Sequence, residues 1–278
     1  MHKETFYTKK DIKDFRLAVF SDLHYYPNYP TKVLNSITNQ IKKSNPDYIL
    51  ILGDILDSAD YTDLDDLRDF LATIANIAPV IAITGNHDQK AGHRHHWRYH
   101  KNEELIKILN SIKNIHLIDN DHYLINNINF HGIILPYEYY DNDEKYEDFV
   151  KLVEPINYLE DNNYNITLIH TPINIYDYLK KNKKANLNKT DLILSGHMHN
   201  GILPYWFTNI VNKVFHTSRG IISPNMKPLP KYSQGRIYER DGYIYQGIAK
   251  LSKSTEKFFF FDRFFVKKIV VIDIKKHQ

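Results

Sequence analysis

Five short segments of this 278-residue chain end in clusters of Asp, Asn and His. In chain order the clusters are Asp22-Leu23-His24, Gly53-Asp54, Gly85-Asn86-His87-Asp88, His170 and Gly196-His197-Met198-His199. Any one of them has an ordinary structural explanation, because Asp, Asn and Gly are the usual residues of turns. Together they offer carboxylate, amide and imidazole ligands, and this combination predicts a metal site.

The donor atoms of these clusters narrow the choice of metal. The candidate ligands are Asp22, His24, Asp54, Asn86, His170, His197 and His199. A donor set this rich in imidazole suits Mn²⁺, Fe or Zn²⁺ better than Mg²⁺. The set is larger than a single ion needs, which predicts two divalent ions. A shared carboxylate would hold two ions about 3.5–4 Å apart, and Asp54, which follows a central strand, is the expected bridge.

The composition excludes several other kinds of site. The chain has no cysteine, so it cannot form a disulfide, a thiolate zinc site, an iron–sulfur cluster or a cysteine nucleophile. Its 42% hydrophobic and 25% charged residues are typical of a globular protein. The formal net charge of +3 is too small to indicate a nucleic-acid partner. The polar start of the chain and the lack of a long apolar run predict a cytoplasmic protein.

The elements that must position the clusters form an alternating series. Apolar, β-rich runs precede the clusters at residues 17–20, 48–52, 80–83, 166–169 and 192–194. Continuous apolar runs of this length indicate strands buried on both faces. Helical periodicity falls between or beside them, at residues 33–41, 64–74, 104–112 and 149–159. The alternation predicts an α/β fold with a largely parallel sheet, in which the carboxyl ends of the strands meet at one edge.

Two parts of the chain do not follow this alternation of strands and helices. Residues 116–134 alternate around Asn126-Asn127 and predict a hairpin. Residues 235–251 predict another around Asp241-Gly242, and residues 266–274 a final strand. We expect these segments to extend a second sheet.

The five clusters, in this order, resemble those of the calcineurin-like metallophosphoesterase superfamily, and the resemblance covers residues 18–201. It implies a four-layer αββα sandwich, in which two mixed β-sheets are flanked by helices and a dinuclear metal site lies at the strand C-terminal ends. It also implies a single domain over residues 1–278, with residues 200–278 closing the second sheet.

The resemblance assigns a role to each cluster. Asp22, His24 and His199 would hold one ion. Asn86, His170 and His197 would hold the other, with Asp54 bridging. A hydroxide shared by the two ions would attack phosphorus, and Asn86 would help to neutralise the growing charge. His87 would bind no metal but protonate the leaving group as general acid. Asp88 has two possible roles: to hold the His87 ring or to cap its own turn.

Substrate contacts are expected from the loops at the same edge. Residues 93–100 follow the His87 turn, so His93, Arg94 and His96 could form a phosphate-attracting lid; the alternative is a solvated loop leading into the next helix. Asn200 stands where many bacterial relatives have glycine, which would affect the fit of the substrate. The tyrosines of the first loop, Tyr25, Tyr26 and Tyr29, could line the cleft or pack the loop.

Two aromatic and basic segments leave a membrane contact open. Residues 202–215 and 258–265 could be core strands or a surface that lies against a bilayer. The family resemblance implies a phosphoester substrate, which could be lipid-linked or a nucleotide.

The most favoured reaction is phosphodiester hydrolysis. The alternatives are a phosphomonoesterase or nuclease of the same chemistry, and a non-catalytic metal-binding scaffold.

Overall fold

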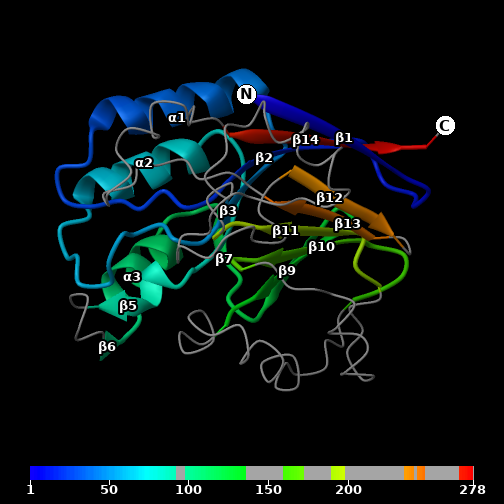
Figure 1. Ribbon diagram of the computed structural model, residues 1–278. Coiled ribbons are helices and arrows are strands. Elements are labelled where there is room, and N and C mark those ends of the chain that lie inside the picture. Colours follow the sequence, from blue (N-terminus) through cyan, green and yellow to red (C-terminus); the bar gives the residue numbers. More distant parts are fainter. Residues whose placement is uncertain are drawn as a thin grey trace, which may run out of the picture.

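The computed structural model describes residues 1–91, 98–135, 159–171, 189–197, 235–240, 243–247 and 269–277. Two six-stranded sheets form the body of the described chain, and a short two-stranded sheet lies apart from them. Three α-helices cover the outer face of the first sheet, and the second sheet packs on its inner face (Figure 1).

The first sheet has the strand order β1-β14-β2-β3-β4-β7. Its strands are β1 (His2–Thr8), β2 (Phe15–Phe20), β3 (Tyr48–Leu52), β4 (Val80–Ile83), β7 (Ile115–Leu117) and β14 (Val270–Lys276). Strands β2, β3, β4 and β7 run parallel, whereas β14 is antiparallel to β2. Parallel neighbours need crossover connections, and the three helices supply them: α1 (Thr31–Ser44), α2 (Asp65–Ala75) and α3 (Glu103–Ser111).

The second sheet has the strand order β12-β13-β11-β10-β9-β8. Its strands are β8 (His122–Ile125), β9 (Ile128–Ile133), β10 (Tyr164–Ile169), β11 (Leu192–Ser195), β12 (Gly235–Arg240) and β13 (Tyr243–Gly247). The four central strands are parallel, and β8 and β12 pair antiparallel at the edges. The short sheet joins β5 (Lys90–Ala91) to β6 (Arg98–Tyr99), after a 3₁₀ turn η1 (His87–Gln89).

The first sheet is buried on both faces, because alternate side chains of a strand point to opposite sides. In β3, Ile49 and Ile51 pack into the cluster formed with the helices, whereas Leu50 and Leu52 pack against the second sheet. Strands β2 and β4 divide their residues in the same way. This two-sided burial explains why these strands read as continuous apolar runs in the sequence.

Most of the predicted elements are confirmed. The five strands that precede the clusters are β2, β3, β4, β10 and β11, and the helices predicted at 33–41, 64–74 and 104–112 are α1, α2 and α3. The predicted helix 149–159 and the helices expected over the second sheet fall almost wholly outside the described residues. Two mixed sheets are present as expected, and the single-domain assignment stays a prediction.

Three details differ from the prediction. The final strand, β14, lies in the first sheet between β1 and β2, so residues 200–278 do not all close the second sheet. The first predicted hairpin is shorter than residues 116–134, because β7 belongs to the first sheet and only β8 and β9 pair around Asn126-Asn127. The strand β1 was not predicted from its polar sequence.

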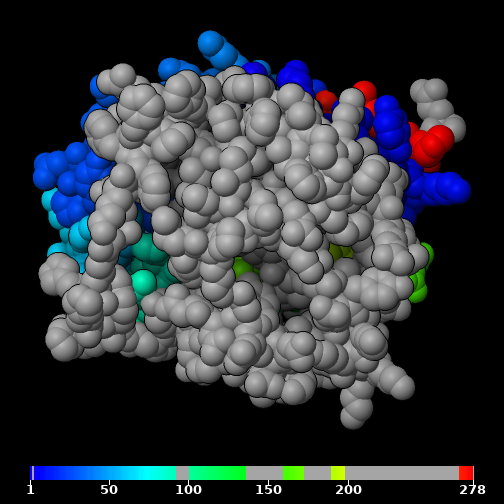
Figure 2. Space-filling view, in the orientation of Figure 1, coloured from blue at the N-terminus to red at the C-terminus, as the bar shows by residue number. Residues whose placement is uncertain are grey.

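The N-terminal and C-terminal strands lie side by side. Strand β1 pairs in parallel with β14 over its whole length, and both reach the surface at the upper right of Figure 2. Tyr7 of β1 is exposed there, and its ring lies beside that of His277. Among the described helices, none has the length and apolar character needed to span a bilayer.

Candidate metal centre

The carboxyl ends of five strands, from both sheets, bring the predicted ligands together. Asp22 and His24 follow β2, Asp54 follows β3 and Asn86 follows β4, all in the first sheet. His170 and His197 follow β10 and β11 of the second sheet. All of these residues are buried except His197, which is half-buried. The two sheets therefore face each other across a polar cluster at one shared edge.

Asp54 lies at the centre of this cluster. Its Oδ2 atom is 3.1 Å from His170 Nε2 and 3.7 Å from His24 Nε2. His170 Nε2 is also 3.1 Å from Asn86 Oδ1, and His24 Nε2 is 3.9 Å from Asp22 Oδ1. Imidazole nitrogens from loops of both sheets thus lie within 3.7 Å of the same carboxylate oxygen.

Two overlapping groups of donors have the spacing of metal ligands. One is Asp22, His24 and Asp54, and the other is Asp54, His170 and His197; within each group the donor atoms lie within 4.8 Å of one another. Asp54 belongs to both groups. Carboxylate and imidazole donors at this spacing fit divalent metal ions.

Glycines that precede the ligands allow this close approach. A Cβ atom on Gly85 would collide with Asp54, and one on Gly196 would collide with Ser21. Gly53 has φ +83°, and a Cβ there would lie 2.7 Å from His170 Nδ1. The Gly-Asp, Gly-Asn and Gly-His pairs of the sequence therefore reflect packing between the loops as well as turn formation.

The ligands themselves lie on unusual backbone. Four of them have φ in the left-handed region: Asp22 (55°), His24 (46°), Asp54 (50°) and His197 (64°). This conformation is uncommon outside glycine and is held only where the surrounding structure enforces it, often at functional sites. The fold thus uses backbone strain to direct four ligand side chains toward one point.

The electrostatics of the cluster favour a cation. Burial alone would raise the pKa of Asp54, but the neighbouring His170, His87 and His24 hold that pKa well below its usual range. Burial alone would lower the pKa of His170, yet the carboxylates of Asp54 and Asp22 raise it to about 9. A site that attracts a proton this strongly attracts a divalent ion for the same reason, and ion binding then releases the proton.

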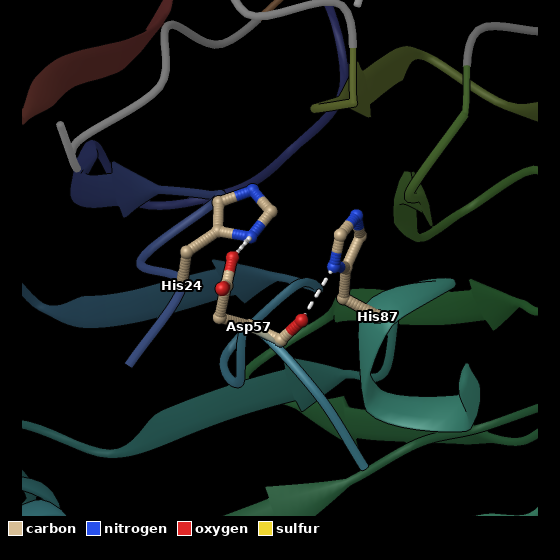
Figure 3. A group of neighbouring side chains, drawn as sticks. All are labelled: His24, Asp57 and His87. Carbon is tan, nitrogen blue, oxygen red and sulfur yellow. Dashed lines mark hydrogen bonds and ion pairs between the residues drawn. The ribbon is translucent and has the colours of Figure 1, made fainter. Parts of the chain in front are cut away.

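Asp57 is a site residue that the sequence analysis missed. It lies on the loop after β3, between two histidines (Figure 3). Its Oδ1 atom is 3.1 Å from His24 Nδ1, and its backbone oxygen is 2.7 Å from His87 Nδ1. A carbonyl oxygen only accepts hydrogen bonds, so Nδ1 of His87 carries the hydrogen. The second nitrogen of each ring points away from Asp57 (Figure 3).

His24, Asp57 and His87 also come close enough to count as a possible metal group. The contacts of the two rings favour another explanation, because His87 Nδ1 is hydrogen-bonded to the backbone oxygen of Asp57 and His24 Nδ1 lies 3.1 Å from its carboxylate. The His24 and His87 rings pack edge to face, with their centroids 4.6 Å apart. Asp57 therefore sets the orientation of a metal ligand and of the histidine beside it, in the manner of carboxylates behind metal-binding histidines.

Of the two roles predicted for Asp88, the structure shows the cap and not the contact with the His87 ring. The Asp88 carboxylate accepts a hydrogen bond from the backbone N–H of Gly85 at 2.8 Å. Burial and the charge of Asp54 raise the pKa of Asp88 to about 7, although three backbone N–H donors oppose the shift.

Several predicted residues lie outside the described chain. They are the ligand His199 and the expected substrate contacts His93, Arg94, His96 and Asn200, together with segments 202–215 and 258–265. Tyr25 and Tyr29 are buried in the hydrophobic cluster under the helices, so they pack the loop after β2. Tyr29 also donates a hydrogen bond to the backbone oxygen of Leu23.

Two curated proteins resemble this chain in sequence. Over 226 residues the chain is 25% identical to an uncharacterized metallophosphoesterase of Aquifex aeolicus, covering 80% of this chain and 77% of that protein. It is 24% identical over 196 residues to another from Campylobacter jejuni, covering 70% of this chain and 47% of that protein.

Among solved structures, the chain matches a purple acid phosphatase of yellow lupin at TM-score 0.40 and 17% identity, covering 68% of this chain and 38% of that one. It matches a dimetal phosphatase from Danio rerio at TM-score 0.44 and 11% identity, covering 85% of this chain and 87% of that one. The sequence profile of the calcineurin-like phosphoesterases matches residues 15–201. The chain therefore belongs to the calcineurin-like phosphoesterase family of metal-dependent phosphoesterases.

Proposed function

We propose that this protein is a dinuclear-metal phosphodiesterase. The observation that carries the proposal is the position of Asp54, whose Oδ2 atom lies 3.7 Å from Nε2 of His24, after a strand of the first sheet, and 3.1 Å from Nε2 of His170, after a strand of the second. A carboxylate in this position can bind two ions at once, which is the arrangement used for displacement at phosphorus.

The ligands divide into two sets around Asp54. One ion would be held by Asp22 and His24 together with His199, and the other by Asn86, His170 and His197. Asp57 supports the first set, because its carboxylate lies 3.1 Å from His24 Nδ1 and leaves Nε2 to face Asp22 and Asp54. The backbone oxygen of Leu52 lies 2.6 Å from His170 Nδ1 and orients that ring in the same way.

Two divalent ions, when bound, lower the pKa of water toward neutrality and offset the charge of the phosphate. The residues of this chain supply the rest of the catalysis. His87 lies beside His24, and its Nδ1–H donates to the backbone oxygen of Asp57, so in the imidazolium form its Nε2–H would be available to protonate the departing oxygen. Asn86 would place an amide beside the equatorial oxygens and help to neutralise the charge that grows there.

The choice of a diester rests on the sequence. The tail of the chain, with Arg219-Gly220 and a terminal apolar strand, resembles that of bacterial family members that act on phosphodiester or lipid-linked substrates. We therefore expect a lipid-linked or nucleotide diester as the natural substrate, contacted by His93, Arg94, His96 and Asn200.

A paired assay tests the proposal. Protein stripped with a chelator and reloaded with Mn²⁺ is given bis-p-nitrophenyl phosphate and, separately, p-nitrophenyl phosphate. The proposal predicts faster turnover of the diester, and no turnover by the Asp54→Asn variant. A preference for the monoester would make the protein a phosphatase. No turnover of either substrate by metal-loaded protein would support the scaffold alternative.

A further inference from the structure

Asp88 makes more contacts than a turn cap requires. Its side chain is buried, with 2% of the residue exposed. Besides Gly85, it accepts hydrogen bonds from the backbone N–H groups of Leu56 at 2.7 Å and Ile55 at 3.2 Å. Ile55 and Leu56 directly follow Asp54, on the other side of the cluster. One carboxylate therefore joins the β3 loop (residues 53–57) to the β4 turn (residues 84–88).

A second hydrogen bond joins the same two segments in the opposite direction. Asp54 Oδ1 accepts a hydrogen bond from the backbone N–H of His87 at 2.8 Å. Each segment thus places a carboxylate on the backbone of the other. The two contacts fix the orientation of Asp54 Oδ2, which is the oxygen that faces His24 and His170.

We infer that Asp88 is a positioning residue for the metal ion that Asn86, His170 and His197 would hold. The inference rests on the proposed function. Asn86, a ligand of that ion, lies between Gly85 and His87, both of which take part in the contacts between the segments. Asp54 directly precedes the two residues that Asp88 holds. Asp88 therefore sets the distance between the bridging carboxylate and the amide ligand, although it binds no metal itself.

The Asp88→Asn variant separates this role from simple packing, because it preserves the size of the side chain. Asp88 Oδ1 accepts from Leu56, whereas Oδ2 accepts from both Ile55 and Gly85. An amide keeps one acceptor oxygen and turns its NH₂ group toward the remaining backbone N–H groups, so the link between the two segments is weakened. Residues behind metal ligands typically change affinity by 10–100-fold. We expect Mn²⁺ titration calorimetry to show that loss at one of two sites, with the other site unchanged.

Asp191→Asn is the matched control. Asp191 also accepts a hydrogen bond from a backbone N–H, that of Asn165 at 2.7 Å. It precedes β11, at the end of the strand opposite the cluster. This variant should lower the melting temperature and leave both Mn²⁺ affinities as in the wild type. If folded Asp88→Asn protein binds both ions within about threefold of the wild type, the inference is wrong.

Amide hydrogen exchange of the wild-type protein gives a test that needs no variant. The N–H groups of Ile55, Leu56 and Gly85 should exchange slowly in NMR spectra, far more slowly than that of Asn126 in the exposed β8–β9 turn. Fast exchange at these amides would refute the inference. Wild-type protein that binds no metal would refute the proposed function instead, while the exchange rates would still test the contacts of Asp88.

Discussion

At the scale of single residues, the candidate metal centre depends on the orientation of its histidine rings. His24 and His87 both direct Nδ1 toward Asp57, one to its carboxylate and one to its backbone oxygen. The two contacts can be separated by mutation, because replacing the side chain leaves the backbone oxygen in place. This separation supports different predictions for His87 and Asp57.

The His87→Ala variant should lose rate and keep its metal. General acid catalysis contributes about 10²–10⁴-fold. The loss should be larger for an alkyl leaving group than for p-nitrophenolate, which departs readily without a proton. Steady-state rates with both kinds of diester, and metal analysis of the purified variant, check the prediction. An empty metal site in this variant would make His87 a ligand and contradict its proposed role.

The Asp57→Ala variant should weaken the ion held by His24. Loss of the carboxylate frees the His24 ring to rotate, and we expect a 10–100-fold loss of Mn²⁺ affinity at one site. Asp60→Ala, an exposed carboxylate on the same loop, is the control and should bind as the wild type does. Equal affinities in calorimetry for the Asp57→Ala and wild-type proteins would show that Asp57 has no orienting role.

At the scale of elements, one residue connects helix α3 to the loop that carries Asp57. Asn102 caps the helix by accepting a hydrogen bond from the Leu105 N–H at 2.7 Å. Its amide group donates to the backbone oxygens of Ala59 and Tyr61 at 2.8 and 2.7 Å. The cap therefore fixes both a helix and a loop of the site.

The Asn102→Ala variant should lower the free energy of unfolding by about 2–3 kcal/mol, because it removes a cap and leaves two carbonyl groups without their donor. Asn102→Ser keeps a cap but cannot reach the carbonyls, so its loss should be smaller. Urea denaturation measures both. A change below about 0.5 kcal/mol for the alanine variant would contradict the account.

The elements also show what a sequence can reveal. Strands β2, β3 and β4 were predictable because burial on both faces leaves a continuous apolar run, and a ligand follows each within three residues. The place of β14 was not predictable, because an apolar strand can pair with strands of either sheet. Strand β1 has the polar start His2-Lys3-Glu4, and Asp57 lies in a loop, where an acidic residue has an ordinary solvated explanation.

At the scale of the whole molecule, a buried histidine makes stability depend on pH. Burial, with a smaller contribution from His122, lowers the pKa of His131 to about 3, against the opposing charge of Asp121. In the unfolded chain this ring titrates near its ordinary value of about 6.5. The unfolded state therefore binds the extra proton between these values, and stability falls as the pH falls from about 6.5 toward about 3.

Glutamine takes up no proton in this pH range, so the His131→Gln variant lacks the pH dependence that His131 causes. Its stability relative to the wild type should improve by about 2 kcal/mol between pH 7 and pH 5, because the wild type alone loses the contribution of His131. The metal ligands are the same in both proteins, so their titration cancels in the comparison. Denaturant midpoints at several pH values measure it, with His122→Gln as the exposed control. A constant difference across this range would refute the prediction.

The bridging of two ions by Asp54 can be tested by anomalous X-ray scattering from crystals loaded with Mn²⁺. This bridging predicts two peaks about 3.5–4 Å apart on either side of Asp54 Oδ2. One should lie beside His24 and the other beside His170. A single peak, or a peak enclosed by His24, Asp57 and His87, would contradict it.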